Sequence, residues 1–238
     1  MPALGDFFRI RVGQDFVAVW DAWVQGILVS ARQVLGEAYD DCYMTAPVWR
    51  FLLPPGTAGA QGVMGVLMPS VDRVGRQFPL TLVGPCGPDA ALHEMARNAA
   101  TFDALEALAL AALGDDMTRD RLSAGLDAIM PTAPATLPVM LTSGTGIVLT
   151  GSTPQTVFAD LALTLGPADL ARSGVWATTV DGMTRIALWS GLPTGAAAAA
   201  LFDMDAAMWT GSDGQPAETS HDDILKDDIF AEIGIGQG

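Results

Sequence analysis

Apolar residues recur every three or four positions between Asp15 and Leu35, which is the spacing of one face of an α-helix. Gly36 follows this stretch, and glycine at that place commonly ends a helix. The pattern therefore predicts an amphipathic helix over 15–35, followed by weaker helical character over 37–43. The apolar stripe consists of Phe16, Trp20, Trp23, Ile27, Ala31 and Leu35.

Three short apolar runs come next, at Val48–Leu53, Val63–Met68 and Phe78–Val83, and each is bounded by proline or glycine. They are too short for typical helices and are predicted to be strands. Turn-forming residues separate them at Pro54–Gly56 and Asp72–Gly75. We therefore expect neighbouring strands to pair antiparallel.

Helical and strand patterns then alternate to about residue 202. Asp181–Gly182 is a strong hairpin signal, because both residues tolerate positive φ. In chain order we predict a helix over 88–113 with a break near Thr101, then a helix over 118–129 capped by Thr118. An irregular connection follows through Pro131, Pro134 and Pro138, and then a strand at 147–149 and a helix from Thr153 to about Leu165. The last predicted elements are strands at 175–180 and 183–189 and an alanine-rich helix from Thr194 to Phe202.

The interleaving of these elements predicts the α/β class, with a mixed, largely antiparallel sheet and helices on both of its faces. The composition changes sharply after Gly211. We therefore expect two parts, an α/β domain over residues 1–211 and an acidic C-terminal tail over residues 212–238.

The net charge and the apolar runs of the chain argue against nucleic-acid binding and membrane insertion. The 238 residues carry a formal charge of −15, and Lys226 is the sole lysine, so a nucleic acid or an anionic membrane would be repelled. No apolar run approaches the roughly 20 residues that a membrane-spanning helix needs. Asp6, Arg9 and Arg11 interrupt any signal-peptide core. We expect a cytoplasmic protein that neither inserts into membranes nor binds nucleic acid.

Candidate catalytic and metal-binding groups are few. His93 lies in a helical pattern and His221 in the acidic tail, and both are interpreted as structural or solvated residues. Cys42 and Cys86 lack metal or redox spacing and are interpreted as reduced core thiols. There is no G-x-S-x-G nucleophile motif. We predict no catalytic residue, no cofactor and no metal.

The stretch Gly146–Thr153 has the glycine spacing of a phosphate-binding loop, but Ser152 occupies the position of the essential lysine. Without that cation the phosphates lose their main charge partner. A strand followed by a capped helix is the better interpretation of this stretch.

The segment Met68–Leu80 is the most distinctive, because it places Asp72, Arg73 and Arg76 on a tight connection between two predicted strands. Asp72 can orient either arginine or accept hydrogen bonds from loop amides. Two interpretations remain open, an ion-paired turn that holds the loop and a surface that recognises a partner.

Besides Met68–Leu80, four other segments are distinctive: Gly5–Phe7, Phe16–Trp23, Ala46–Phe51 and Gly191–Pro193. Taken in chain order, the five segments resemble signatures of the TagF (ImpM) family of type VI secretion proteins. The resemblance spans roughly residues 3 to 205. It implies a three-layer αβα sandwich and a non-enzymatic cytoplasmic protein. It also implies post-translational repression of type VI secretion, through regulatory partners that include a forkhead-associated scaffold protein. Arg50, Asp72, Arg73 and Arg76 become the candidate partner-binding residues, whereas Trp20, Trp23, Trp49 and Phe51 are expected in the core.

Two departures from the family pattern bear on these expectations. Relatives usually carry a Gly-rich first strand ending in Lys-Leu-Pro ahead of the Gly-Asp-Phe, whereas this chain has Met1–Leu4 there. Two expectations follow: either that strand is missing, or the start codon is assigned too late. Phosphatase-fused relatives have metal motifs that this chain lacks, so no phosphatase activity is expected. The alternatives are a structural or assembly subunit of the secretion apparatus, or an enzyme whose site leaves no linear motif.

The tail poses a separate question. Between Asp213 and Glu232 there are seven acidic residues and one lysine, and Leu225, Ile229 and Ile233 recur every four positions. This pattern predicts a short acidic amphipathic helix that docks in a groove on this domain or on a partner. The alternative is a tail that is disordered.

Overall fold

A computed structural model describes residues 12–87, 91–114, 116–129 and 172–210, together with the strands at 139–143 and 146–150 and isolated positions at 155, 158–159 and 162. The chain divides into two compact units, Met1–Met204 and Asp205–Gly238. Within the second unit the description covers residues 205–210, which include the short helix α8 (Ala207–Thr210). The predicted tail and its amphipathic helix lie outside the described residues, so the boundary at residue 211 stays a prediction.

The first unit is organised around a five-stranded antiparallel sheet in the order β3-β2-β1-β6-β7. Its strands are β1 (Trp49–Leu53), β2 (Val63–Met68), β3 (Leu80–Pro85), β6 (Gly174–Val180) and β7 (Met183–Trp189). All five correspond to predicted strands, and β3 begins two residues later than expected. The register places Phe51 of β1 between Gly65 of β2 and Trp176 of β6.

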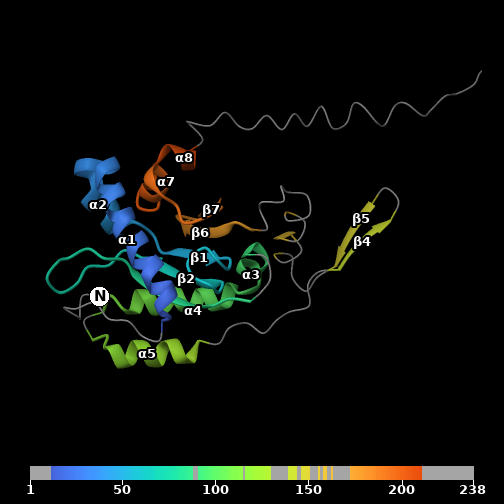
Figure 1. Ribbon diagram of the computed structural model, residues 1–238, viewed down its shortest axis with the longest axis horizontal. Helices are drawn as coiled ribbons and strands as arrows, with labels where there is room; N and C mark the ends of the chain where they lie inside the picture. The colour runs from blue at the N-terminus through green and yellow to red at the C-terminus, as the bar shows by residue number, and fades with distance from the viewer. Residues whose placement is uncertain are drawn as a thin grey trace, which may run out of the picture. The chain divides into compact units, whose positions relative to one another are not determined.

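Helices cover both faces of this sheet (Figure 1). Phe51 faces α1 (Gln14–Leu35), whose Trp20 ring lies 4.9 Å from the Phe51 ring. The next residue, Leu52, faces the other way and packs in a cluster with Phe102 of α4 (Ala99–Ala111). This alternation follows from the two-residue period of a strand. The α/β class and the antiparallel sheet with helices on both faces are therefore confirmed.

The α1 side of the sheet is an aromatic core. Trp20, Trp23 and Trp176 lie within 4.5–6.4 Å of one another, measured between ring centroids. Trp23 Nε1 donates a hydrogen bond to the Pro193 carbonyl at 2.8 Å, which anchors α7 (Gly195–Ala199) beside α1. The expectation that Trp20, Trp23, Trp49 and Phe51 belong to the core is confirmed, since each is at most 8% exposed.

The remaining described helices are shorter. A single 3-10 turn, η1 (Gly36–Ala38), leads from α1 into α2 (Tyr39–Thr45). On the opposite face lie α3 (Ala91–Arg97), α4 and α5 (Arg119–Ala128). Thr118 caps α5 as predicted, because its side chain accepts a hydrogen bond from the Arg121 amide.

The break in the predicted helix over 88–113 lies at Asn98, not at Thr101. The Asn98 side-chain amide donates to the Glu94 carbonyl and to the Glu94 carboxylate, each at 2.9 Å. A short amide side chain that bonds the local backbone in this way competes with helix continuation. The result is two helices, α3 and α4, in place of one.

The alanine-rich helix is also shorter than predicted: α7 ends at Ala199, whereas the prediction extended to Phe202. Beyond it the spacing tightens, since the amides of Leu201 and Phe202 donate three residues back to Ala198 and Ala199. Leu201 and Phe202 are buried, and Trp49 Nε1 donates to the Leu201 carbonyl at 2.7 Å. Tertiary packing therefore overrides the helical propensity of the alanines here.

The sequence analysis missed one strand, which follows residues 131–138; the irregular connection predicted there lies outside the described residues. The strand β4 (Val139–Ser143) pairs antiparallel with β5 (Gly146–Thr150), which is the predicted strand around residue 148. The predicted helix from Thr153 to Leu165 lies almost wholly outside the described residues.

The hairpin between β6 and β7 is confirmed at Asp181–Gly182, where φ is 51° and 76° respectively. None of the described helices combines the length and the apolar character that a membrane span requires.

Candidate functional site

The connection between β2 and β3 forms a closed loop, which we call the Asp72 loop and define as residues 71–77. An antiparallel bridge between Val71 and Gln77 closes its base. The Asp72 amide donates to the Arg76 carbonyl, and the Gly75 amide donates to the Asp72 carbonyl, both at 3.0 Å. Gly75 has φ of 82°, a conformation that favours glycine.

The Asp72 carboxylate organises the interior of this loop. Its Oδ1 accepts hydrogen bonds from the Val74 and Arg76 amides, both at 2.9 Å, and its Oδ2 accepts one from Arg76 Nε at 2.6 Å. Burial raises the pKa of Asp72, but the Arg76 amide, the Arg76 guanidinium and the Val74 amide outweigh it and hold the pKa below its ordinary value. The interpretation as an ion-paired turn is therefore correct for Asp72 and Arg76.

Arg73 and Val74 lie at the tip of the Asp72 loop, and their side chains are exposed. Val74 is 69% exposed. Arg73 is exposed, and its guanidinium makes no hydrogen bond or ion pair with any residue that the structure describes. The sequence analysis left open whether Asp72 orients Arg73 or Arg76, and the geometry selects Arg76.

Gln77 joins the base of the loop to two helices. Its side-chain oxygen accepts a hydrogen bond from Arg32 of α1 at 3.1 Å, and its side-chain nitrogen donates to Asp40 of α2 at 2.9 Å. The Arg32 guanidinium in turn lies 4.6 Å from the centre of the Tyr39 ring. The loop is thereby fixed against the α1–α2 corner.

Tyr43 provides a second anchor, just before the loop. Its hydroxyl donates to the Ser70 carbonyl at 2.8 Å and accepts from the Ser70 amide at 3.1 Å. The same Ser70 carbonyl accepts from the Phe78 amide, across the loop base. Burial raises the pKa of Tyr43, so its hydroxyl stays protonated and available as a donor.

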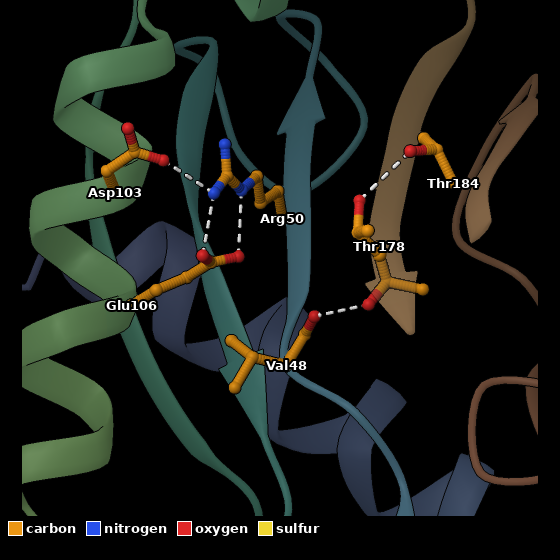
Figure 2. Close-up of polar contacts among 7 residues, drawn as sticks. Val48, Arg50, Asp103, Glu106, Thr178 and Thr184 are labelled. Atoms are coloured by element: carbon orange, nitrogen blue, oxygen red, sulfur yellow. Dashed lines mark hydrogen bonds and ion pairs between the residues drawn. The ribbon is translucent and has the colours of Figure 1, made fainter. Parts of the chain in front are cut away.

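Arg50, the fourth candidate, is not brought together with the Asp72 loop. It lies on β1, and its side chain extends toward α4 on the opposite side of the sheet from α1 (Figure 2). Its Nε and Nη2 atoms bond the two oxygens of Glu106 at 2.7 and 2.6 Å, and Nη2 also bonds Asp103 at 2.8 Å. The Glu106 hydrogen bonds raise the pKa of Arg50 despite its partial burial. This bidentate cluster, which we call the Arg50 clamp, fixes α4 to β1.

Sequence reasoning missed the residues that complete both clusters. Gln77 lies inside the distinctive segment Met68–Leu80, but because its side chain is uncharged the sequence did not single it out as a candidate. Glu106 interrupts the apolar run over 105–113, and its position on the helix face toward the sheet was a signal that it needed a cationic partner. Arg32, Tyr43 and Asp103 carried no local signal.

The described histidine and cysteine residues do not belong to a group of three or more possible metal ligands. His93 is 9% exposed at the edge of the core, beside Glu94, which pairs with Arg97. Cys42 and Cys86 are free thiols, and burial raises the pKa of Cys86 to about 11, with Glu94 acting in the same direction. No group of three or more histidine, cysteine or acidic residues among the described positions could hold a metal ion. His221 lies outside the described residues.

Comparison with known proteins connects these features to a family. Residues 1–129 match the model of the TagF N-terminal domain, which is described as type VI secretion system-associated. No curated protein sequence matches the chain. The fold is similar to the 2.05 Å crystal structure of PA0076 from Pseudomonas aeruginosa PAO1, with a TM-score of 0.65 and 28% sequence identity over 84% of this chain and 89% of that one.

The matched segment contains α1, the first three strands of the sheet, the Asp72 loop and the Arg50 clamp. It covers more than half of the 238 residues. The chain therefore belongs to the TagF family of type VI secretion system-associated proteins.

Proposed function

We propose that this chain is a non-catalytic, cytoplasmic accessory protein that represses type VI secretion after translation, by binding a protein partner through the Asp72 loop. Membership of the TagF family supports the association with secretion. The observation that carries the binding mode is the contrast within the loop. Asp72 and Arg76 hold its backbone, whereas Arg73 and Val74 are exposed at its tip.

A loop of this kind suits recognition because its conformation is fixed before the partner arrives. Hydrogen bonds within the loop and its links to α1 and α2 through Gln77 limit its conformational freedom. Binding then loses less entropy than it would with a flexible loop. Val74 offers apolar surface to bury, and Arg73 offers a guanidinium that can pair bidentately with a carboxylate.

The partner we propose is a regulatory protein of the secretion system. The forkhead-associated scaffold that the family resemblance implies is the first candidate to test. A partner that presents carboxylates beside a shallow apolar surface would complement Arg73 and Val74.

The direct test measures export of the secretion tube protein from native cells that overproduce this chain. We expect export to fall while intracellular tube protein stays constant. An Arg73→Glu, Val74→Asp double variant should lose this effect, because both substitutions change the exposed tip and leave the bonds of Asp72 in place. Arg119→Glu is the matched control, since it reverses an exposed arginine at the start of α5; it should repress as the parent does.

Unchanged export with a folded parent chain would contradict repression. Repression that persists in the double variant would keep the regulatory role but remove the Asp72 loop as the binding surface. Stoichiometric co-purification with the membrane or baseplate complex would instead favour a structural subunit.

A further inference from the structure

The face of α1 that points away from the sheet carries a continuous row of residues. Among the hydrogen bonds of the described residues, Asp15 at one end of this row accepts one from the Ala60 amide at 3.3 Å. The row repeats at alternating intervals of four and three positions, which is the spacing of a coiled-coil seam. All its members are exposed. We call this row the α1 seam, and its residues are Asp15, Val19, Ala22, Gly26, Val29 and Gln33.

The centre of this helix is uncharged all the way round. Between Ala22 and Ala31 the chain has no acidic or basic residue, although the whole chain carries a formal charge of −15. The inward side is the buried aromatic and aliphatic core, while Val19 and Val29 on the seam are 41% and 53% exposed. A surface helix normally turns charged residues to solvent, and a helix without such a face is usually buried on both sides.

Gly26 lies at the middle of the seam and has no role within this chain. A Cβ atom built at Gly26 would meet no atom within 4 Å. Glycine inside a helix is less stable than alanine by about 1 kcal/mol. Because the fold does not need a glycine here, the missing side chain points to the close approach of a second backbone from outside the chain.

The seam is complementary to itself when two copies run antiparallel. A two-fold axis midway between Ala22 and Gly26 places each of these small residues opposite the other in the second copy. The same axis places Val19 opposite Val29 and Asp15 opposite Gln33, since each pair of numbers has the same sum. Small residues at the crossing allow close helix approach, valines pack on either side, and a carboxylate meets an amide at each end.

We propose that the α1 seam is a homodimer interface, in which two copies of this chain pack α1 against α1 in antiparallel orientation. A symmetric dimer is the commonest oligomer, and it requires one self-complementary surface of this kind. Two copies with a charge of −15 repel each other, and the four central seam residues, Val19, Ala22, Gly26 and Val29, carry no charge that would add to this repulsion. The proposal does not depend on the Asp72 loop or on any secretion partner.

The size of the seam sets the expected affinity. It is about 27 Å long, because 18 steps of about 1.5 Å separate Asp15 from Gln33. One helix face buries less than the ~800 Å² per partner of a stable interface, so the dissociation constant should be on the order of 10–100 μM. Association should strengthen as salt rises toward about 1 M, because screening weakens the repulsion between copies and leaves the apolar contact.

Sedimentation equilibrium of the full chain over a range of concentrations tests the proposal. We expect the weight-average mass to rise from monomer toward dimer. Gly26→Glu should weaken association at least tenfold, while the thermal midpoint of the dilute variant equals or exceeds that of the parent, since glutamate is the better helix former and enters open space. Ala107→Glu adds the same charge at an exposed position of α4 and should leave association unchanged.

Cysteine cross-linking tests the orientation. A mixture of Val19→Cys and Val29→Cys chains should form a disulfide-linked dimer, whereas neither variant alone should, because its two thiols would be about 15 Å apart along the helix. The parent chain controls for Cys42 and Cys86. A chain that stays monomeric at roughly 1 mM, or a dimer that Gly26→Glu leaves intact, would overturn the proposal.

Discussion

The Arg50 clamp and the Asp72 loop both combine carboxylates with guanidinium groups, but carboxylates outnumber guanidinium groups in the clamp and guanidinium groups outnumber carboxylates in the loop. In the clamp, two carboxylates, Glu106 and Asp103, share one arginine. In the loop, one carboxylate, Asp72, bonds Arg76 and leaves Arg73 without a described acidic partner. In the clamp, the Arg50 guanidinium is therefore already paired with carboxylates between β1 and α4, whereas in the loop the exposed Arg73 guanidinium has no described acidic partner. Arg73 can pair with a carboxylate of a partner without first losing an ion pair that holds the fold, and Arg50 cannot.

The largest expected effect on stability is at the clamp. Arg50→Ala should lower the free energy of unfolding by about 2–3 kcal/mol, because it removes a bidentate pair and leaves two carboxylates close together without a cation. Urea denaturation measures this. Arg50→Lys keeps the charge but loses the two-point geometry, and it should fall between parent and alanine variant. A loss below about 0.5 kcal/mol would show that the clamp does not hold α4.

The next largest effect is expected at the Asp72 loop, whose contribution to the free energy of unfolding should depend on pH. The folded pKa of Asp72 lies below its ordinary value of 3.8, so its carboxylate stabilises the loop at neutral pH. That stabilisation begins to fall as pH drops below the ordinary value, and it is lost as pH passes the lower folded value. Asp72→Asn should therefore be less stable than the parent at pH 7, and the difference should shrink as the pH falls below 3.8. A difference independent of pH would contradict the role of the charge.

A smaller effect is expected where the loop meets the helices. Gln77→Ala removes hydrogen bonds to Arg32 and Asp40, both exposed, so the free energy of unfolding should fall by only about 0.5–1 kcal/mol. Amide exchange of the loop should become faster, while exchange in the strands should not change. Thr45→Ala, which removes an exposed hydrogen bond at the end of α2, is the matched control. Equal exchange in both variants would mean that Gln77 does not fix the loop.

The smallest effect on stability should come from the loop tip. Arg73→Glu should change the free energy of unfolding by less than about 0.5 kcal/mol, because its side chain bonds no described residue. Together with Arg50→Ala, this variant separates the two clusters, since one should disturb the fold and the other should disturb partner binding alone. A large loss of stability in Arg73→Glu would show that Arg73 is structural after all.

The candidate residues show where sequence reasoning stopped. Asp72, Arg73 and Arg76 were found because they are neighbours in one short segment, and a turn between strands brings such neighbours together. Arg50 was grouped with them on resemblance, but its partner Glu106 is 56 positions away and on another layer. No local pattern reports which arginine on a strand faces which carboxylate on the helix that packs over it.

The sequence by itself determined the elements whose causes are local. The period of apolar residues set α1, and short apolar runs bounded by proline or glycine set the first three strands. Asp181–Gly182 set the hairpin, and Thr118 set the start of α5. Tertiary structure decided the rest. It placed the helix break at Asn98, ended α7 at Ala199, paired β4 with β5, and divided the four candidate residues between the Arg50 clamp and the Asp72 loop. Periodicity and turn chemistry act over a few residues, whereas burial and charge pairing depend on segments that meet only when the layers pack.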